Sequence, residues 1–137
     1  MTDTKNSNID QLWSDVFQKQ MSQRLNDCYS AIDGLDKMIK ILDGLLNRMQ
    51  PPISGKLRIY WSRKQNEYGI LLTPYLVKWT KTKSKRWKIE PTNKRADLAV
   101  LRTNGFEHHY AQTKAVVNEV SFLLAERKEL IEKLRVF

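Results

Sequence analysis

The stretch ILDGLLNRMQPPISGKLRIYW, residues 41–61, contains the change of pattern that decides the fold. Its first half spaces apolar side chains by three and four residues, the period of an amphipathic helix. Pro51–Pro52 then ends the helix, because proline donates no backbone amide and restricts the residue before it. Beyond the prolines, Leu57, Ile59 and Trp61 alternate with more polar residues, which predicts a half-buried strand. The chain therefore passes from helix to sheet at the two prolines.

Upstream of the prolines, one apolar stripe keeps this helical spacing for about four heptads, which predicts coiled-coil packing. The stripe consists of Leu25, Cys28, Ile32, Leu35, Ile39, Leu42, Leu46 and Met49. Nearer the N-terminus a second stripe lies out of register with the first, and it contains Ile9, Leu12, Trp13, Val16 and Phe17. We therefore expect a bend, a break or a second packing partner around residues 19–23.

The C-terminal segment mirrors the N-terminal one, with apolar positions that again step by three and four over residues 106–137. A neighbouring stripe of Tyr110, Val117, Leu124 and Ile131 makes this face wider than a single partner helix covers. Two interpretations stay open. In one, the extra stripe lies on the sheet or on the N-terminal segment of the same chain. In the other, which we favour, two chains form a homodimer that bundles four long helices.

Between the helical segments the sequence predicts three antiparallel strands, at Leu57–Trp61, Ile70–Thr80 and Arg86–Glu90. Pro74 inside the second strand indicates an edge position or a bulge, because proline cannot donate to a strand ladder. The prediction is thus a small sheet whose second and third strands form a hairpin.

The register of this hairpin follows from its side chains. Pairing Trp79 with Trp87 sorts the strands into an apolar face and a cationic face, with Thr82–Ser84 at the tip. The remaining pairs are Val77 with Ile89, Lys78 with Lys88, Thr80 with Arg86 and Lys81 with Lys85. We expect the apolar face to pack on the helices, with both tryptophans and Trp61 in the core.

These patterns predict a single α+β domain over residues 1–137. Two long antiparallel coiled-coil-like helices, at 8–50 and 105–137, flank a central three-stranded antiparallel β-sheet with a basic hairpin at 56–91. A chain of 137 residues has room for one good core.

The net charge of +9 is concentrated in the middle of the chain. Residues 51–100 hold twelve Lys or Arg and three Asp or Glu, whereas residues 1–50 hold six and seven. KWTKTKSKRWK, residues 78–88, carries six positive charges and two tryptophans without an acidic residue. Because like charges packed this densely repel one another, we expect the segment to meet a polyanion.

A basic hairpin with aromatic residues is suited to nucleic acid. Cations release counterions from phosphates, and a two-stranded ribbon fits the major groove of DNA, so duplex DNA is favoured over RNA. Exposed tyrosines, Tyr60, Tyr68 or Tyr75, are the expected aromatic contacts. The candidate contact residues are Arg58, Arg63, Lys64, Lys78, Lys81, Lys83, Lys85, Arg86, Lys88, Lys94 and Arg95.

The expected function is that of a DNA-binding accessory or regulatory protein. The order of elements resembles small accessory proteins of plasmids, phages and conjugative elements, without a diagnostic motif. The alternative is a protein-interaction module, such as a phage-type inhibitor, that docks an acidic surface of a protein partner. Salt dependence and competition by non-specific DNA distinguish the two interpretations.

Catalytic and cofactor chemistry finds little support in the residues. No phosphate-binding glycine loop, nucleophile elbow or metalloprotease motif is present, so we expect no enzyme, cofactor or catalytic residue. His108 and His109 are adjacent and would point about 100° apart on a helix, which does not suit one metal ion. Cys28 is the only cysteine and is expected to fill the core. With no signal-peptide pattern or apolar span, we expect a cytoplasmic protein that does not enter a membrane.

Overall fold

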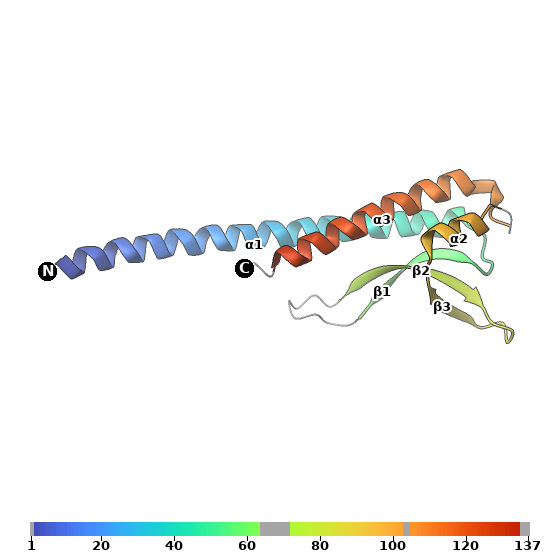
Figure 1. Ribbon diagram of the computed structural model, residues 1–137, viewed down its shortest axis with the longest axis horizontal. Coiled ribbons are helices and arrows are strands. Elements are labelled where there is room, and N and C mark those ends of the chain that lie inside the picture. Colours follow the sequence, from blue (N-terminus) through green and yellow to red (C-terminus); the bar gives the residue numbers. More distant parts are fainter. Residues whose placement is uncertain (1, 64–71, 103–104, 135–137) are drawn as a thin grey trace.

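The computed structural model describes residues 2–63, 72–102 and 105–134, with side chains from residue 8 onward. It confirms the α+β class and the three-stranded antiparallel sheet, with strand order β1-β2-β3 (Figure 1). The elements are α1 (Thr2–Met49), β1 (Lys56–Ser62), β2 (Thr73–Lys81), β3 (Trp87–Pro91), α2 (Lys94–Val100), a 3-10 turn (Glu107–His109) and α3 (Tyr110–Lys133). The helix α2 was not expected from the sequence.

The helices α1 and α3 run antiparallel and side by side, and both lie on the same side of the sheet (Figure 1). The apolar stripe of α1 is its inner face: Ile39 and Leu46 are fully buried in one cluster with Val117 and Val120 of α3. The expectation that the helices flank the sheet is therefore not confirmed, and their coiled-coil character stays a prediction. Among the described residues, no helix is long and apolar enough to cross a membrane.

A buried ion pair joins the two helices to the start of β2. The guanidinium of Arg127 donates from Nε to Asp36 Oδ1 at 2.6 Å and from Nη2 to the carbonyl oxygen of Leu72 at 2.9 Å. The arginine is almost fully buried, and the partners come from α1 and from the chain just before β2. This contact fixes the sheet beneath the helices.

The face of the sheet that packs against the helices is the one that carries the buried side chains of β1. Leu57 and Ile59 belong to the main core cluster, and Leu76 of β2 packs against it. Because side chains alternate along a strand, Lys78 points toward the helices and Trp79 points away from them. The expectation that the tryptophans of the hairpin pack on the helices is therefore wrong, although Trp61 does pack against the core.

The hairpin register differs from the expected one by two residues. The expected register placed Lys78 opposite Lys88, and like charges directly opposite each other are destabilising. The structure places Lys78 opposite Glu90 instead. The other pairs are Val77 with Pro91, Trp79 with Ile89, Thr80 with Lys88 and Lys81 with Trp87. Because the shift is an even number of residues, each side chain still shares a face with the residues expected there.

Pro74 lies near the start of β2, opposite Trp61 of β1. β3 pairs only with Val77–Lys81, so among the described residues no strand lies on the other side of β2 at Pro74. β2 is the central strand of the sheet, and at Pro74 it is locally an edge.

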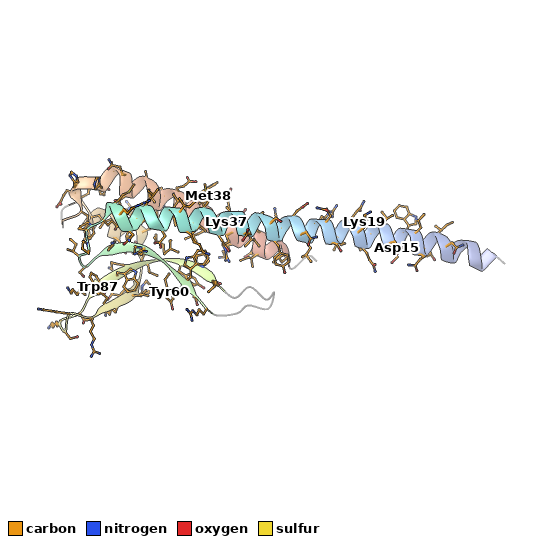
Figure 2. The ribbon with its side chains drawn as sticks, turned by 180° about the vertical axis from the view of Figure 1, so that it is seen from behind. Asp15, Lys19, Lys37, Met38, Tyr60 and Trp87 are labelled. Atoms are coloured by element: carbon orange, nitrogen blue, oxygen red, sulfur yellow. The ribbon has the colours of Figure 1, made fainter. Side chains whose placement is uncertain are left out.

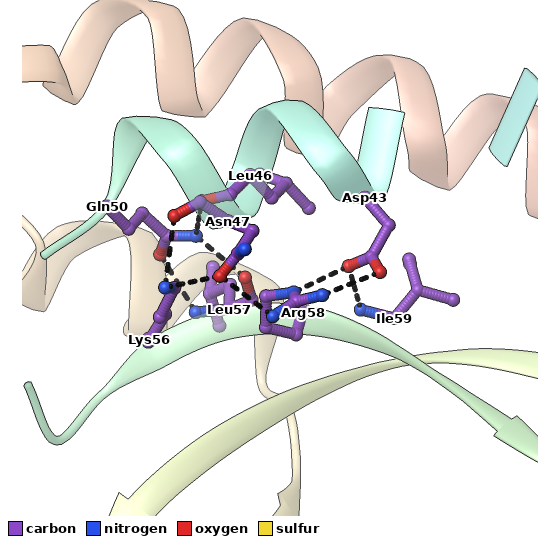
Figure 3. A network of polar contacts seen from close by, with 8 residues as sticks. All are labelled: Asp43, Leu46, Asn47, Gln50, Lys56, Leu57, Arg58 and Ile59. Atoms are coloured by element: carbon purple, nitrogen blue, oxygen red, sulfur yellow. Dashed lines mark hydrogen bonds and ion pairs between the residues drawn. The ribbon is translucent and has the colours of Figure 1, made fainter. Parts of the chain in front are cut away.

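Side chains of α1 close the free edge of β1 (Figure 3). The backbone amide of Leu57 donates to Gln50 Oε1 at 2.8 Å, and Gln50 Nε2 donates to the Leu57 carbonyl at 2.7 Å. Two residues further along, the amide of Ile59 donates to Asp43 Oδ1 at 2.9 Å. An uncovered edge is a template for pairing with another chain, so these contacts protect the sheet and hold it against α1.

Candidate nucleic-acid interface

The distal end of the hairpin carries four cations, Lys81, Lys83, Lys85 and Arg86, which we call the basic tip. The amide of Lys85 donates to the Thr82 carbonyl at 2.9 Å, and the amide of Thr82 donates to the Arg86 carbonyl at 2.8 Å. Lys85 has φ 64°, the left-handed conformation that ends a three-residue hairpin loop. The four cations therefore lie in and beside this turn, at the end of the β2–β3 ladder.

The basic tip is exposed and electrostatically uncompensated. All four side chains are exposed to solvent. None of the ion pairs formed among the described residues includes a cation of the tip. Lys81 Nζ lies 5.5 Å from the centre of the Trp87 ring, which supports a cation–π contact. The tip is therefore available to an anionic partner.

Arg58, a predicted contact residue, is committed to the fold. Its guanidinium donates from Nε and Nη2 to the two carboxylate oxygens of Asp43 at 2.8 and 2.9 Å, and from Nη1 to Asn47 Oδ1 at 2.9 Å (Figure 3). The hydrogen bond to Asp43 raises the pKa of Arg58 above its usual value. A bidentate pair of this kind fixes the arginine against α1.

Lys78 is committed in the same way, to α2. Its Nζ lies 3.1 Å from Asp97 Oδ1 and 3.9 Å from Glu90 Oε2. Asp97 is buried, and its other oxygen accepts from Thr92 Oγ1 at 3.1 Å and from the Asn93 amide at 2.9 Å. The carboxylate therefore joins β2, the loop between β3 and α2, and α2 itself.

Lys88 is intermediate between the paired cations and the cations of the tip. Its Nζ lies 3.0 Å from Glu90 Oε1, yet 57% of its side chain is exposed. The hydrogen bond from Lys88 is the main reason that the pKa of Glu90 is lowered, and the charge of Lys78 acts in the same direction. Lys88 is accessible but partly compensated.

The remaining predicted cations lie away from the tip or outside the described residues. Lys94 and Arg95 occupy the first turn of α2, and Arg63 follows the end of β1 in an exposed position. None of the three takes part in an ion pair within the described ranges. Lys64 and Tyr68 fall outside the described residues. The predicted set is thus divided by the fold rather than gathered into one patch.

The outer face of the sheet, which points away from the helices, is aromatic. It carries Tyr60, Tyr75, Trp79 and Trp87, and Figure 2 labels Tyr60 and Trp87 on the sheet. Trp87 and both tyrosines are exposed. A shallow recess of about 300 Å³ on this face is lined by Pro52, Lys56, Arg58, Trp79 and Trp87. Burial, followed by the charge of Arg58, lowers the pKa of Lys56.

Two acidic residues that neutralise predicted contacts, Asp43 and Asp97, were not identified from the sequence as structural partners. Asp43 lies beside the apolar stripe of α1, where polar residues are common whether or not they make a contact. The sequence therefore carries no specific signal that Asp43 pairs with Arg58. Asp97 had one: Asn93 after Pro91 is a typical helix N-cap, and its side chain accepts from the Ala96 amide at 3.3 Å. That cap marks a short helix, and Asp97 falls in its first turn.

Within the part of the chain that the structure describes, no three His, Cys, Asp or Glu side chains group in a way that could hold a metal ion. Comparison of the chain with protein families, curated proteins and solved structures finds no match.

Proposed function

We propose that this chain is a non-enzymatic nucleic-acid-binding protein and that the basic tip is its main contact surface. The supporting observation is that Arg58 and Lys78, two cations of the sheet that reach the helices, are paired with carboxylates, while those of the tip are not. Each cation placed against a phosphate releases condensed counterions, and this release favours binding. A cation that is already paired with a carboxylate contributes less to binding.

Duplex DNA is the favoured target because of the shape of the hairpin. β1 pairs with β2 only as far as Trp79, and Ser54 Oγ accepts from the Lys81 amide at 3.0 Å just beyond it, so the distal end of the hairpin extends past β1 as a ribbon of two strands. The major groove is about 12 Å wide and admits such a ribbon. In this arrangement Arg86 reaches base edges, where arginine binds guanine, and the tip lysines bind the flanking phosphates.

Under this proposal the protein has an accessory or regulatory role, of the kind found in plasmids, phages and conjugative elements. The helices serve as a frame that supports the sheet, from which the hairpin ribbon extends.

The test is a binding assay by fluorescence anisotropy with duplex DNA, single-stranded DNA and hairpin RNA. We expect the intact protein to bind duplex DNA most tightly. Replacing Lys81, Lys83 and Lys85 together with Ala should weaken binding to every duplex by about 10- to 100-fold. The matched control replaces Lys114, Lys128 and Lys133, three exposed lysines of α3, and should change the affinity little. Equal losses in both variants would contradict the proposal.

The aromatic outer face makes single-stranded nucleic acid the second candidate. Bases can stack on exposed aromatic rings, and each stacked base contributes about 1–3 kcal/mol. If this target is correct, Trp87→Ala should weaken binding to single strands more than the triple lysine change does. In the duplex proposal the order of the two effects is reversed.

A protein-interaction module that docks an acidic partner remains the alternative of another class. The second apolar stripe of α1, near its N-terminus, favours this alternative, because its residues are exposed and such a stripe is typical of a protein contact. A specific protein complex should survive an excess of non-specific DNA, whereas nucleic-acid binding through the tip should not.

A further inference from the structure

The N-terminal part of α1 packs against no other described element. α3 ends beside the middle of α1, where Leu134 contacts Cys28 and Ile32. Every residue from Asn8 to Gln20 is exposed, and Figure 1 shows the blue end of α1 projecting far beyond α3. We call residues 8–24 the free arm. Of the bend, break or second packing partner expected around residues 19–23, the break is absent, since α1 is one continuous helix.

The free arm exposes large apolar side chains on one side. Leu12, Trp13 and Phe17 are 66%, 71% and 61% exposed. Ile9 and Val16 lie on the same stripe and are exposed as well. In proteins most helical stability comes from the packing of an apolar face, and contiguous exposed apolar patches are typical of interaction sites. The apolar stripe of the arm is therefore a candidate contact for a partner.

The charges of the arm identify the partner. Asp10 and Asp15 precede Lys19 and Arg24 along the helix. Asp10 and Arg24 are separated by two heptads and Asp15 and Lys19 by one turn, so each pair lies on one flank of the apolar stripe. If two arms align antiparallel about Phe17, Asp10 faces Arg24 of the second copy. Asp15 then faces Lys19 of the second copy. Parallel alignment places like charges together.

We propose that the free arm binds the free arm of a second copy of this chain in antiparallel orientation, and that the dimer holds two nucleic-acid segments at its two ends. The pairing of the arms is inferred from the residues of the arm alone, whereas the binding of two nucleic-acid segments rests on the proposed function. The pairing covers the apolar stripe with its own equivalent and matches every charge named above with an opposite one.

The geometry of this dimer separates the two basic tips widely. The sheet is attached to α1 near Asp43, Asn47 and Gln50. From Phe17 to Asn47 the helix rises about 45 Å, so the two sheets sit about 90 Å apart. Half-sites one helical turn apart on DNA are separated by only about 34–36 Å. The dimer is therefore suited to bridging two duplexes, or two distant positions on one, rather than to adjacent half-sites.

The first test is the mass of the full-length protein in solution, measured by light scattering after size exclusion. We expect twice the chain mass of 16.2 kDa. Phe17→Glu should raise the dissociation constant of the dimer by at least about 100-fold, because it buries a charge at the contact. Ile41→Glu is the matched control, since Ile41 is also 61% exposed on α1 but lies outside the arm. A monomeric native protein, or a dimer broken by Ile41→Glu and not by Phe17→Glu, would overturn the proposal.

The orientation is tested by a distance between spin labels. Ser30 is exposed, and a label on Ser30→Cys in a Cys28→Ala background reports the separation of the two copies. Antiparallel pairing about Phe17 places the labelled positions about 40 Å apart along the axis. Parallel pairing brings the helix axes to about 10 Å at this position. A short distance would contradict the antiparallel arrangement.

Bridging is tested with one duplex fixed on beads and a second duplex that carries a fluorophore. The native protein should retain the fluorescent duplex on the beads, whereas Phe17→Glu should still bind each duplex but leave the fluorescent one in solution. Retention that persists with a monomeric Phe17→Glu would overturn the bridging inference. If neither variant binds DNA, the proposed function fails, while the mass and distance measurements still decide whether the arms pair.

Discussion

Two sets of cations in the basic hairpin and its neighbouring strand differ in their surroundings and not in residue type. Near the helices, Arg58 and Lys78 face Asp43 and Asp97, carboxylates contributed by other elements. At the distal end of the same hairpin, the basic tip lies beyond the reach of the helices. A local excess of positive charge in a sequence is thus a mixture of cations that hold the fold together and cations that are free for a partner.

The largest expected effect comes from removing the carboxylate that holds Lys78. Asp97→Ala leaves a partly buried ammonium without its closest partner and deprives the Asn93 amide of its acceptor. We expect a loss of about 3 kcal/mol in the free energy of unfolding, measured by urea denaturation. If the variant is as stable as the native protein, Lys78 belongs with the free cations after all.

A somewhat smaller effect is expected at the edge of β1. Arg58→Met should destabilise the protein by about 2 kcal/mol, because Asp43 stays partly buried without its bidentate partner. Lys37→Met is the control: its pair with Asp33 is also on α1 but is exposed, so its loss should cost under about 0.5 kcal/mol. Equal losses would mean that the Arg58 pair is no more structural than a surface pair.

Within the tip, stability and binding should separate. Lys85→Gly should stabilise the protein by about 0.5–1 kcal/mol, because glycine adopts the positive φ at this position without strain. The same change removes one cation and should weaken DNA binding several-fold. Lys83→Gly removes one cation from the same turn without relieving a positive φ, so its affinity should fall equally while its stability does not rise. Thermal denaturation and anisotropy together measure both quantities.

Local patterns predicted the elements well, because periodicity is a property of neighbouring residues. The stripe that includes Ile39 and Leu46 is the buried face of α1, and Leu57 and Ile59 are the buried face of β1. The orientation of the hairpin was not predictable in this way. It depends on the offset between β1 and β2, which places Ile59 opposite Leu76 and thereby turns the hairpin tryptophans outward.

The candidate site shows the same limit. Sequence spacing located the cations of the tip, but it contained no information on which cations would meet a carboxylate. These ion pairs join residues that are far apart in the sequence: Asp43 and Arg58 are fifteen residues apart, and Lys78 and Asp97 are nineteen residues apart. The predicted register paired the two tryptophans and thereby placed Lys78 opposite Lys88. The observed register, shifted by two residues, avoids the repulsion between these two lysines.

In the proposed complex the basic tip, rather than the basic segment as a whole, contacts the phosphates. The direct measurement is the slope of the logarithm of the duplex-binding constant against the logarithm of salt concentration. Each lost phosphate contact lowers the magnitude of the slope by about 0.9. The tip variant lacking Lys81, Lys83 and Lys85 should therefore show a slope shallower by about 2.7 than the native protein, while the α3 variant lacking Lys114, Lys128 and Lys133 keeps the native slope. An unchanged slope in the tip variant, or an equal change in both, would contradict the claim.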